Sequence, residues 1–514
     1  GSSAMAPGRL PLPHEAPYAQ DGPALGDTPS RTSTGSKSTL PEVIENLGTG
    51  LAQVRTGLLA GPVWFADGAE LILISSVTDV VAAEWGFSPA QKGAVVTFVY
   101  MGVLVGNLLS GPFGDNFGRR LPILLSFLFI FICSMFSALA WGFWSLGLFR
   151  FLVGVSIGIG QPAQQALVSE TTPTKWRIVF TSVGMFLFAM GEVYSGFLLL
   201  ADDPQLLDLH WRTMLIAGAV PSVVFGLLAF AFLNQSPLFL ACGGRYEETQ
   251  EILESMRKDN SAPGVSIDFK PHRVLCGGSG AQSNLSRMLG IIFGGEHLVT
   301  TCVLVLSCFV LNLSYYGSLY AFPIVLSQGV DIGSSPALGL VYGGLLENIG
   351  YIVGIVCILY FPRITVMRSY VLVMGLALML FAVFAPQNGP GAHIGAMFGY
   401  YGTKFTVSIG FLVFYLYTSE VYPTSVRATG TAVVFAGGRI AAMASPLIYE
   451  YIASAFHFAA FFWLMALFNG ANFFCTSFLQ VETFGKVMKD EEDAVEDIVE
   501  DGAPEYGSTQ HERG

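Results

Sequence analysis

Charged residues are scarce in this sequence. Of its 514 residues only 12% are Asp, Glu, Lys or Arg, whereas 52% are hydrophobic. A soluble globular protein carries about 25% charged residues, so this chain has too little polar surface to cover a water-soluble body. The low charge therefore argues against a soluble fold and predicts a polytopic membrane protein.

Motifs of catalysis and of nucleotide binding are also missing. The sequence has no Walker motif and no Cys-x-x-Cys, its seven histidines form no cluster with metal-ligand spacing, and no nucleophile stands beside a base. The glycines of Gly158-Ile-Gly160 lie inside an apolar run with no strand before it, so they do not form a dinucleotide loop. We expect no catalytic residues, no metal, no cofactor and no nucleic-acid partner, and an ATP-driven pump or a membrane enzyme is disfavoured.

The apolar residues come in twelve blocks of about twenty residues each. A helix of that length crosses the ~30 Å hydrocarbon core of a bilayer, and within a single segment a helix satisfies every backbone group there. We predict an all-α polytopic membrane protein with twelve transmembrane helices in two six-helix halves. The predicted spans are 57–78, 91–111, 121–141, 144–166, 178–200, 213–233, 298–320, 337–360, 369–386, 393–416, 426–448 and 455–479.

The more polar stretches divide the chain and predict its orientation. Lys and Arg gather in the loops on the side of the two termini, and the opposite loops are acidic, so both termini are expected in the cytoplasm. The membrane is expected to be the plasma membrane or an intracellular vesicle membrane, and the protein a monomer. The predicted segments are 1–50, a disordered cytoplasmic extension; 51–233, the N-terminal six-helix half; 234–297, a cytoplasmic central loop with a short amphipathic helix; 298–480, the C-terminal six-helix half; and 481–514, an acidic cytoplasmic tail.

One octapeptide pattern, E-x-x-P-T-x-x-R, occurs twice. The first copy runs from Glu170 to Arg177 and the second from Glu420 to Arg427, so the copies start 250 residues apart. Each copy follows one long apolar run and precedes another. A pattern repeated in the same context indicates that the second half of the chain repeats the first.

A second motif lies between the second and third predicted spans. Residues 111–120 read Gly-Pro-Phe-Gly-Asp-Asn-Phe-Gly-Arg-Arg, where the glycines permit a tight turn and the charged side chains can bond to helix ends. The stretch resembles the loop signature G-x-x-x-D-x-x-G-R-[RK] of the major facilitator superfamily. With the twelve spans and the repeated octapeptide, the resemblance implies the fold of that superfamily and a gate at the cytoplasmic helix ends. The expected gate residues are Gly114, Asp115, Gly118, Arg119, Arg120, Glu170, Arg177, Glu420 and Arg427.

Within the superfamily the chain most resembles the organic ion transporter branch that includes the synaptic-vesicle-2-related proteins. It departs from the family pattern at 361–368, where a second loop signature is expected but no acidic residue occurs. It also departs at 234–238, where Asn-Gln-Ser-Pro-Leu replaces Pro-Glu-Ser-Pro-Arg. These changes predict that the gate contacts of Glu170 and Glu420 differ in strength. The resemblance is carried by Asp67–Glu70, Arg150–Gly154, Ser314–Gly317, Leu346–Glu347, Ser419–Thr424, Arg439 and Val481–Thr483.

Several ionisable residues fall inside the predicted spans. Each costs about 2.5–3.5 kcal/mol there, so each needs either an ion pair or a role in transport. Asp67 and Glu70 are three residues apart on one helix face, and two close carboxylates disfavour double ionisation, so that one can hold a proton or bind a cation. In the alternative, Glu70 pairs with a basic residue of span four or eleven. The other embedded candidates are Arg150, Glu192, Glu347, Lys404 and Arg439.

Uncharged candidates complete the predicted substrate or proton site. Gln161 and Gln165 share a face of span four and suggest a cavity wall. Asn312 and Tyr316 lie in span seven with Tyr315 and Tyr320, where simple packing is the alternative. Arg439 is expected to bind a substrate carboxylate or to neutralise Glu347.

These features predict a secondary active transporter that moves a small organic ion by alternating access around a site near the membrane midplane. Protonation of one of the embedded carboxylates would couple transport to a proton gradient. Both signs of charge are present, so the sign of the substrate stays open. Two alternatives remain: a non-transporting vesicle receptor or nutrient sensor with the same fold, and a phosphate or sugar porter. The phosphate porters' span-four Asp is absent here, which argues against phosphate.

Overall fold

The computed structural model describes residues 38–270, 285–295, 297–387, 389, 391–422, 426–479 and 481–484. The described part of the chain is built from α-helices, as the long apolar runs predict. They are α1 (Leu40–Leu47), α2 (Leu51–Ala60), α3 (Pro62–Trp85), α4 (Pro89–Phe117), α5 (Arg120–Ala138), α6 (Phe143–Thr171), α7 (Arg177–Asp202), α8 (Trp211–Phe232), α9 (Pro237–Cys242), α10 (Tyr246–Asp259), α11 (Leu285–Ile292), α12 (Leu298–Ser327), α13 (Pro336–Tyr360), α14 (Arg363–Phe384), α15 (Ala392–Val421), α16 (Arg427–Ala455) and α17 (Phe458–Cys475).

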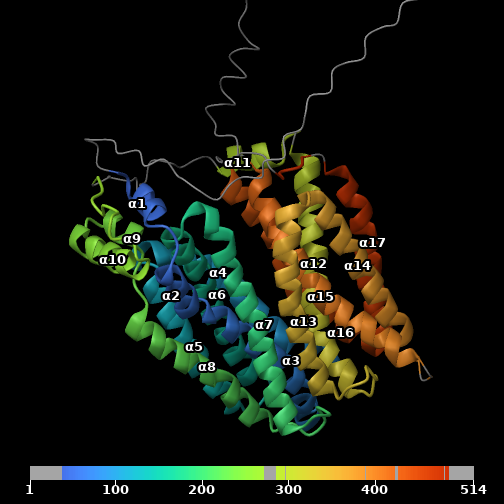
Figure 1. Ribbon diagram of the computed structural model, residues 1–514. Helices are drawn as coiled ribbons and strands as arrows, with labels where there is room; N and C mark the ends of the chain where they lie inside the picture. The colour runs from blue at the N-terminus through green and yellow to red at the C-terminus, as the bar shows by residue number, and fades with distance from the viewer. Residues whose placement is uncertain are drawn as a thin grey trace, which may run out of the picture.

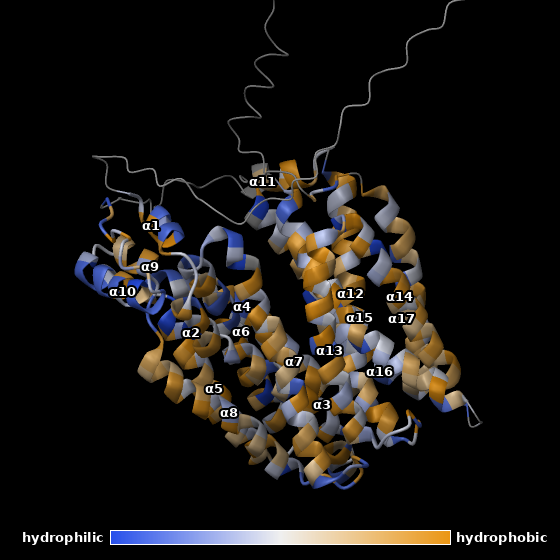
Figure 2. Ribbon diagram, in the orientation of Figure 1, coloured by the Kyte–Doolittle hydropathy of each residue, from blue (hydrophilic) through white to orange (hydrophobic). Residues whose placement is uncertain are grey.

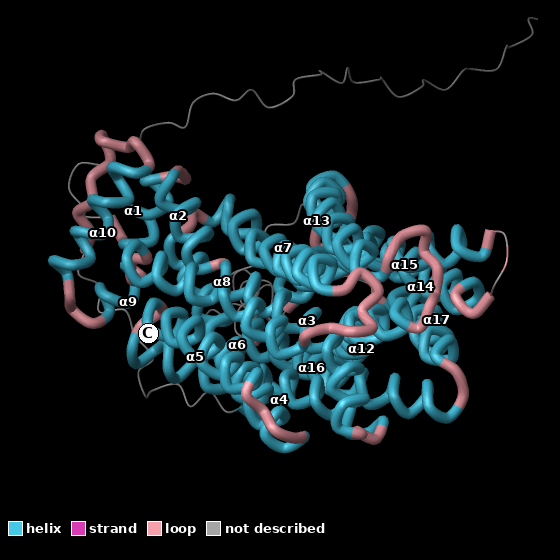
Figure 3. Tube along the Cα trace, turned by 90° about the horizontal axis from the view of Figure 1, so that it is seen from below, coloured by secondary structure: helices cyan, strands magenta, loops and turns pink. Residues whose placement is uncertain are grey.

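The long helices form two bundles that stand side by side (Figure 1). The first bundle holds α3 to α8 and the second holds α12 to α17. Both ends of the described chain lie at the same end of the bundles, which we call the termini end; the opposite end is the far end (Figure 1). At their interface α7 packs on α13, α4 on α16 and α3 on α12, as the view from the far end shows (Figure 3).

Eleven helical stretches of the described chain are long and apolar enough to cross a membrane, with α2 and α3 counted together as Leu51–Trp85. The twelfth long helix, α15, has 30 residues but contains Lys404 and several tyrosines, which lower its hydropathy. The outer faces of α5 and α8 carry exposed apolar side chains such as Leu128 and Phe230, and they are coloured hydrophobic in Figure 2. A patch of this extent on a soluble monomer is rare, so these faces are those that contact lipid.

Helices α4 and α6 approach each other closely because glycines line their contact. A Cβ atom on Gly102 or Gly106 would lie 2.1 or 2.2 Å from a backbone oxygen of α6. A Cβ on Gly154 or Gly158 would lie 2.1 or 2.3 Å from a backbone oxygen of α4. Both helices thus carry a G-x-x-x-G pattern, the arrangement that lets membrane helices pack backbone to backbone.

We expect Gly154→Ala to destabilise the first bundle, because its methyl group would force α4 and α6 apart. Overpacking of this kind costs about 1–3 kcal/mol. The midpoint of thermal unfolding in detergent should fall, with a smaller monodisperse fraction on size exclusion. The matched control is Gly111→Ala on α4, where an added Cβ meets nothing within 4 Å. Equal midpoints for the two variants would show that the close packing does not limit stability.

A small cluster at the termini end corrects one sequence prediction. Residues 1–50 were expected to be disordered, yet Leu40–Leu47 form α1, whose N-terminus has a capping box between Thr39 and Glu42. The apolar face of α1 packs against Leu253 and Met256 of α10. The expectation for this segment was wrong because its i, i+3, i+4 apolar spacing finds a partner surface only in the central loop.

Candidate functional site

A buried ion pair joins α3 to α6. The guanidinium of Arg150 donates from Nη1 to Glu70 Oε2 at 2.6 Å, and both side chains are at most 2% exposed. Ser134 donates to the other oxygen of Glu70 at 2.6 Å, and Arg150 Nε donates to Ser137 at 2.9 Å. The predicted alternative, in which Glu70 pairs with a basic residue of span four, is therefore what the geometry favours. Since hydrogen bonds satisfy both carboxylate oxygens of Glu70, we interpret this ion pair as a structural contact between α3 and α6.

Asp67 lies one turn away in a different environment. Gln161 of α6 donates to Asp67 Oδ2 at 2.7 Å, whereas Oδ1 is buried without a hydrogen-bond partner among the described residues. Tyr100 of α4 also has a buried hydroxyl without a described partner. Buried polar atoms are nearly always bonded in native structures, so these two atoms are free to bond to water or to another molecule.

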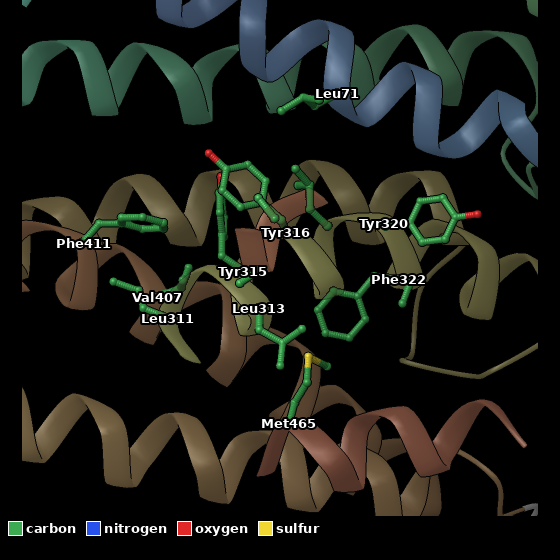
Figure 4. Packing of buried hydrophobic residues seen from close by; sticks show 14 of the residues in the cluster. Leu71, Leu311, Leu313, Tyr315, Tyr316, Tyr320, Phe322, Val407, Phe411 and Met465 are labelled. Atoms are coloured by element: carbon green, nitrogen blue, oxygen red, sulfur yellow. The ribbon is translucent and has the colours of Figure 1, made fainter. Parts of the chain in front are cut away.

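The second bundle contributes Arg439 and Tyr316 to the same place. The guanidinium of Arg439 on α16 interacts electrostatically with Tyr316 and with Asp67. No carboxylate of the described residues lies within ion-pair distance of it, and Glu347, its predicted alternative partner, pairs with Lys404 instead. The ring of Tyr316 meets that of Tyr100 edge to face, with centroids 4.9 Å apart. Figure 4 shows Tyr315, Tyr316 and Tyr320 along α12 with Leu71 of α3 opposite. We call Asp67, Tyr100, Gln161, Tyr316 and Arg439 the central site.

A second charged cluster spans the interface between the bundles. Lys404 of α15 donates to Glu192 of α7 at 2.6 Å and to Glu347 of α13 at 3.2 Å. The hydroxyl of Tyr315 lies 2.8 Å from the other oxygen of Glu192 and 3.1 Å from the other oxygen of Glu347. All four side chains are buried. We call these four residues the interface tetrad.

At the far end an ion-pair cluster also joins the two bundles. Lys92 of α4 pairs with Asp79 of α3 and, at 3.3 Å, with Glu450 of α16. Tyr320 of α12 donates to Glu450 at 2.7 Å. Between the end of α7 and the start of α13, the amide of Ala337 donates to the carbonyl of Pro204 at 3.1 Å. The far end of the interface is closed in this structure by these contacts.

The predicted gate residues of the first bundle meet at the termini end. Arg119 donates to Asp115 at 2.7 Å and to Glu170 at 3.1 Å. Partial burial alone would lower the pKa of Arg119, but the hydrogen bonds and negative charges of its two partners raise it above its ordinary value. Gln235 accepts from the backbone amides of Arg119 and Arg120 at 2.9 and 3.1 Å, so it caps α5. The amide thus keeps the hydrogen bonds where the family's acid is missing.

The second bundle repeats this arrangement with different residues. Arg363 at the start of α14 lies 3.4 Å from Glu420, as Arg119 lies beside Glu170. Glu482 accepts from the backbone amides of Arg363 and Ile364 at 2.9 and 3.1 Å, and so occupies the place of Gln235. Residues 361–368 still lack a counterpart of Asp115, which accepts from the side chain of Arg119. Sequence reasoning missed the cap by Glu482 because this residue lies 119 residues from Arg363.

The remaining predicted residues lie outside the buried clusters described above or contribute no charged contact to them. Asn312 donates back to the carbonyl of Cys308 in its own helix at 2.8 Å, and Gln165 is half-buried on α6. At the termini end Arg177 is exposed, and Arg427 donates to the carbonyl of Tyr422 at 3.3 Å. The two predicted gate glycines leave room for neighbouring side chains. A Cβ on Gly118, whose φ is +82°, would lie 2.2 Å from Gln235, and one on Gly114 would lie 3.1 Å from Arg119.

Sequence reasoning missed several residues of these clusters. Tyr100, Lys92, Glu450 and Asp79 were not among the predicted site residues. Lys92 and Glu450 sit near the ends of their helices, where a charge needs no partner in the membrane, so their sequence positions gave no signal. Tyr100 is one of many aromatic residues in apolar runs. Only the packing of α4 against α12 and α16 shows that Tyr100, Lys92 and Glu450 make contacts between the two bundles.

Comparisons with known proteins agree with this architecture. The profile of the family described as "Sugar (and other) transporter" matches residues 47–493. The "Putative transporter svop-1" of Caenorhabditis elegans is 26% identical over 462 residues, covering 83% of either chain. The "Organic cation/carnitine transporter 7" of Arabidopsis thaliana is 24% identical, covering 88% of this chain and 96% of that protein. The "Synaptic vesicle 2-related protein" of Xenopus laevis is 26% identical, covering 79% and 74%.

A solved structure has the same fold. The inward open conformation of the xylose transporter XylE from E. coli superposes with a TM-score of 0.68, covering 86% of this chain and 99% of that chain. The two sequences are 17% identical. At this identity the likeness extends to the arrangement of helices, not to the bound molecule.

Proposed function

The chain belongs to the sugar (and other) transporter family, and we propose that it is a secondary active transporter of a small organic ion. The predicted major facilitator fold is confirmed, and so is the predicted resemblance to the synaptic-vesicle-2-related branch. The observation that carries the proposal is the central site, where Asp67 of one bundle has an unsatisfied oxygen and interacts electrostatically with Arg439 of the other bundle. A site between two halves is what alternating access requires, because rocking the halves exposes it to each side in turn.

The charges of the central site favour a substrate with a cationic group. A cationic group beside the free oxygen Oδ1 of Asp67 would balance the charge of that carboxylate, and the faces of Tyr100 and Tyr316 suit a cation by cation–π attraction. Arg439 would pair with a carboxylate on the same molecule through charge-assisted hydrogen bonds. The name of the Arabidopsis relative, organic cation/carnitine transporter 7, supports this choice.

A neutral sugar is the second candidate. It is favoured by the amide of Gln161 and the hydroxyls of Tyr100 and Tyr316, which can bond to sugar hydroxyls, and by the xylose transporter fold. Against it stand Asp67 and Arg439, since neither forms a close ion pair among the described residues and a neutral ligand would supply no charge to pair with either group. A receptor that binds without transport is the remaining alternative.

The proposal includes the orientation and location of the protein. The basic gate residues at the termini end support a cytoplasmic location of that end by the positive-inside rule, with the far end facing outside the cell or into a vesicle. The synaptic-vesicle-2-related relatives support a vesicle membrane. We further propose that the protein acts as a monomer and that protons drive transport.

The test is uptake into proteoliposomes with a matched panel of substrates, each assayed with and without a proton gradient across the membrane. The panel contains choline, carnitine, nicotinate, xylose and phosphate; choline and carnitine share a trimethylammonium group, and carnitine adds a carboxylate. We expect uptake of the two ammonium compounds at least tenfold above empty liposomes. Uptake of xylose alone would replace our proposal with a sugar porter, and binding of a panel compound without any flux would favour a receptor.

A further inference from the structure

We infer that the interface tetrad holds one exchangeable proton, shared through Tyr315 between Glu347 and Glu192, and that the far end closes by taking up this proton. The inference rests on the proposed function and names the site through which protons would act on it. Transport of the substrate itself is assigned to the central site, which shares no residue with the tetrad.

The hydrogen bonds of Tyr315 carry the first step. Its hydroxyl oxygen lies within hydrogen-bond distance of one oxygen of Glu192 and one oxygen of Glu347. A hydroxyl has one proton to donate, so it cannot donate to two carboxylates at once. Both contacts are hydrogen bonds if one carboxyl is protonated and donates to the Tyr315 oxygen while Tyr315 donates to the other.

The distances indicate which carboxyl holds the proton. Glu192 has the shorter contacts, 2.6 Å to Lys404 and 2.8 Å to Tyr315. Glu347 has the longer ones, 3.2 and 3.1 Å to the same two groups. Bonds to an ionised oxygen are the shorter ones, so Glu192 is the carboxylate paired with Lys404 and Glu347 is the protonated carboxyl.

Charge balance also indicates that the tetrad holds one exchangeable proton. Lys404 supplies one positive charge to two buried carboxyls, and two carboxylates in one buried site do not both ionise readily. Among the described residues, the other titratable groups that interact electrostatically with the tetrad are tyrosine hydroxyls, which add no compensating charge. They are Tyr100 of α4, Tyr316 of α12, Tyr351 of α13 and Tyr400 of α15.

The position of the tetrad links this proton to the closure of the far end. Glu192 belongs to the first bundle, and its three partners belong to the second. Beside it α7 and α13 are in close contact, since a Cβ on Gly196 would lie 2.8 Å from Val341 and one on Gly344 would lie 2.8 Å from Val193. Parting the bundles at the far end must draw Glu192 away from Lys404 and Glu347.

The two states of the tetrad therefore differ by one proton. Before the far end opens again, the O–H bond of Glu347 breaks and its proton passes to water on the cytoplasmic side, so that one proton crosses the membrane in each cycle. With the far end open, water hydrates both carboxylates and Lys404 can pair with Glu347 alone. On closure the carboxylates return to a single lysine, and Glu347 forms that bond again with a proton from the far compartment. Acidity in that compartment thus favours closure of the far end.

The full-length protein in proteoliposomes provides the test, with Glu347→Gln as the mimic of the protonated state. Choline counterflow, in which labelled and unlabelled substrate exchange without a gradient, should stay within threefold of the wild type. Accumulation driven by a proton gradient should fall at least tenfold, and proton entry followed with a pH-sensitive dye should be lost. Glu347→Asp, which keeps a titratable group, should retain part of both.

Tyr315→Phe is a second, conservative variant that removes only the shared hydroxyl, so a folding defect of Glu347→Gln does not decide the result. Infrared difference spectra between acidic and neutral pH should show a protonated-carboxyl band in the wild type that is absent in Glu347→Gln. Wild-type proton coupling that survives in both Glu347→Gln and Tyr315→Phe would overturn the inference and leave the proposed function intact. Wild-type protein without counterflow of any panel compound would overturn the proposed function itself.

Discussion

Replacing Arg150 by methionine is expected to lower the free energy of unfolding by about 3–5 kcal/mol, because it leaves the buried Glu70 carboxylate without its counter-charge. Glu70 is 2% exposed, and after the change only the hydroxyl of Ser134 would bond to it. The loss is measured by reversible unfolding in mixed micelles. A functional ion pair that breaks during each transport cycle would tolerate the change far better than this static pair.

Two controls separate burial from charge. The double variant Glu70→Gln with Arg150→Gln removes both charges and keeps polar groups, so it should be less destabilising than Arg150→Met alone. Lys258→Met removes an exposed ion pair on α10, where Lys258 lies 3.6 Å from Glu254 and is 74% exposed. An exposed pair contributes about 0–1 kcal/mol. If Arg150→Met and Lys258→Met were equally mild, the pair with Glu70 would not stabilise the fold.

Much of the fold could be predicted from the sequence because a bilayer imposes local rules. Length and apolarity define a membrane helix within one segment, and the repeated octapeptide marked the paired positions Glu170 and Glu420 that the structure places beside Arg119 and Arg363. The segment around α1 was missed for the opposite reason. Its eight residues are too few to show a membrane helix, and its apolar face is covered by a helix about 200 residues later.

The candidate site was predicted as a set of residues but not as a set of contacts. Because a charge in hydrocarbon is costly, Glu192, Glu347 and Lys404 could each be predicted individually as a site residue. Their grouping depends on how α7, α13 and α15 pack, and Lys404 lies 212 residues from Glu192. Asp67 and Glu70 show the same limit. Helical spacing correctly put them on one face, yet one meets Arg150 and the other meets Gln161.

Variants of the central site should change the uptake of each panel compound according to the charges that it carries. Asp67→Asn keeps the size of the side chain and the bond from Gln161 but removes the negative charge, so uptake of choline and of carnitine should both fall at least a hundredfold. That factor corresponds to about 2.7 kcal/mol, and the lost attraction between the Asp67 carboxylate and the trimethylammonium charge in a buried site accounts for it.

Arg439→Gln provides the complementary test, because carnitine, unlike choline, carries a carboxylate for the guanidinium to bind. We expect carnitine uptake to fall about tenfold or more, about 1.4 kcal/mol, while choline uptake changes less than threefold. The ratio of the two rates within one preparation cancels differences in protein yield, so it isolates recognition from folding. An equal loss of both compounds would mean that Arg439 serves to balance the charge of Asp67 rather than to bind the substrate.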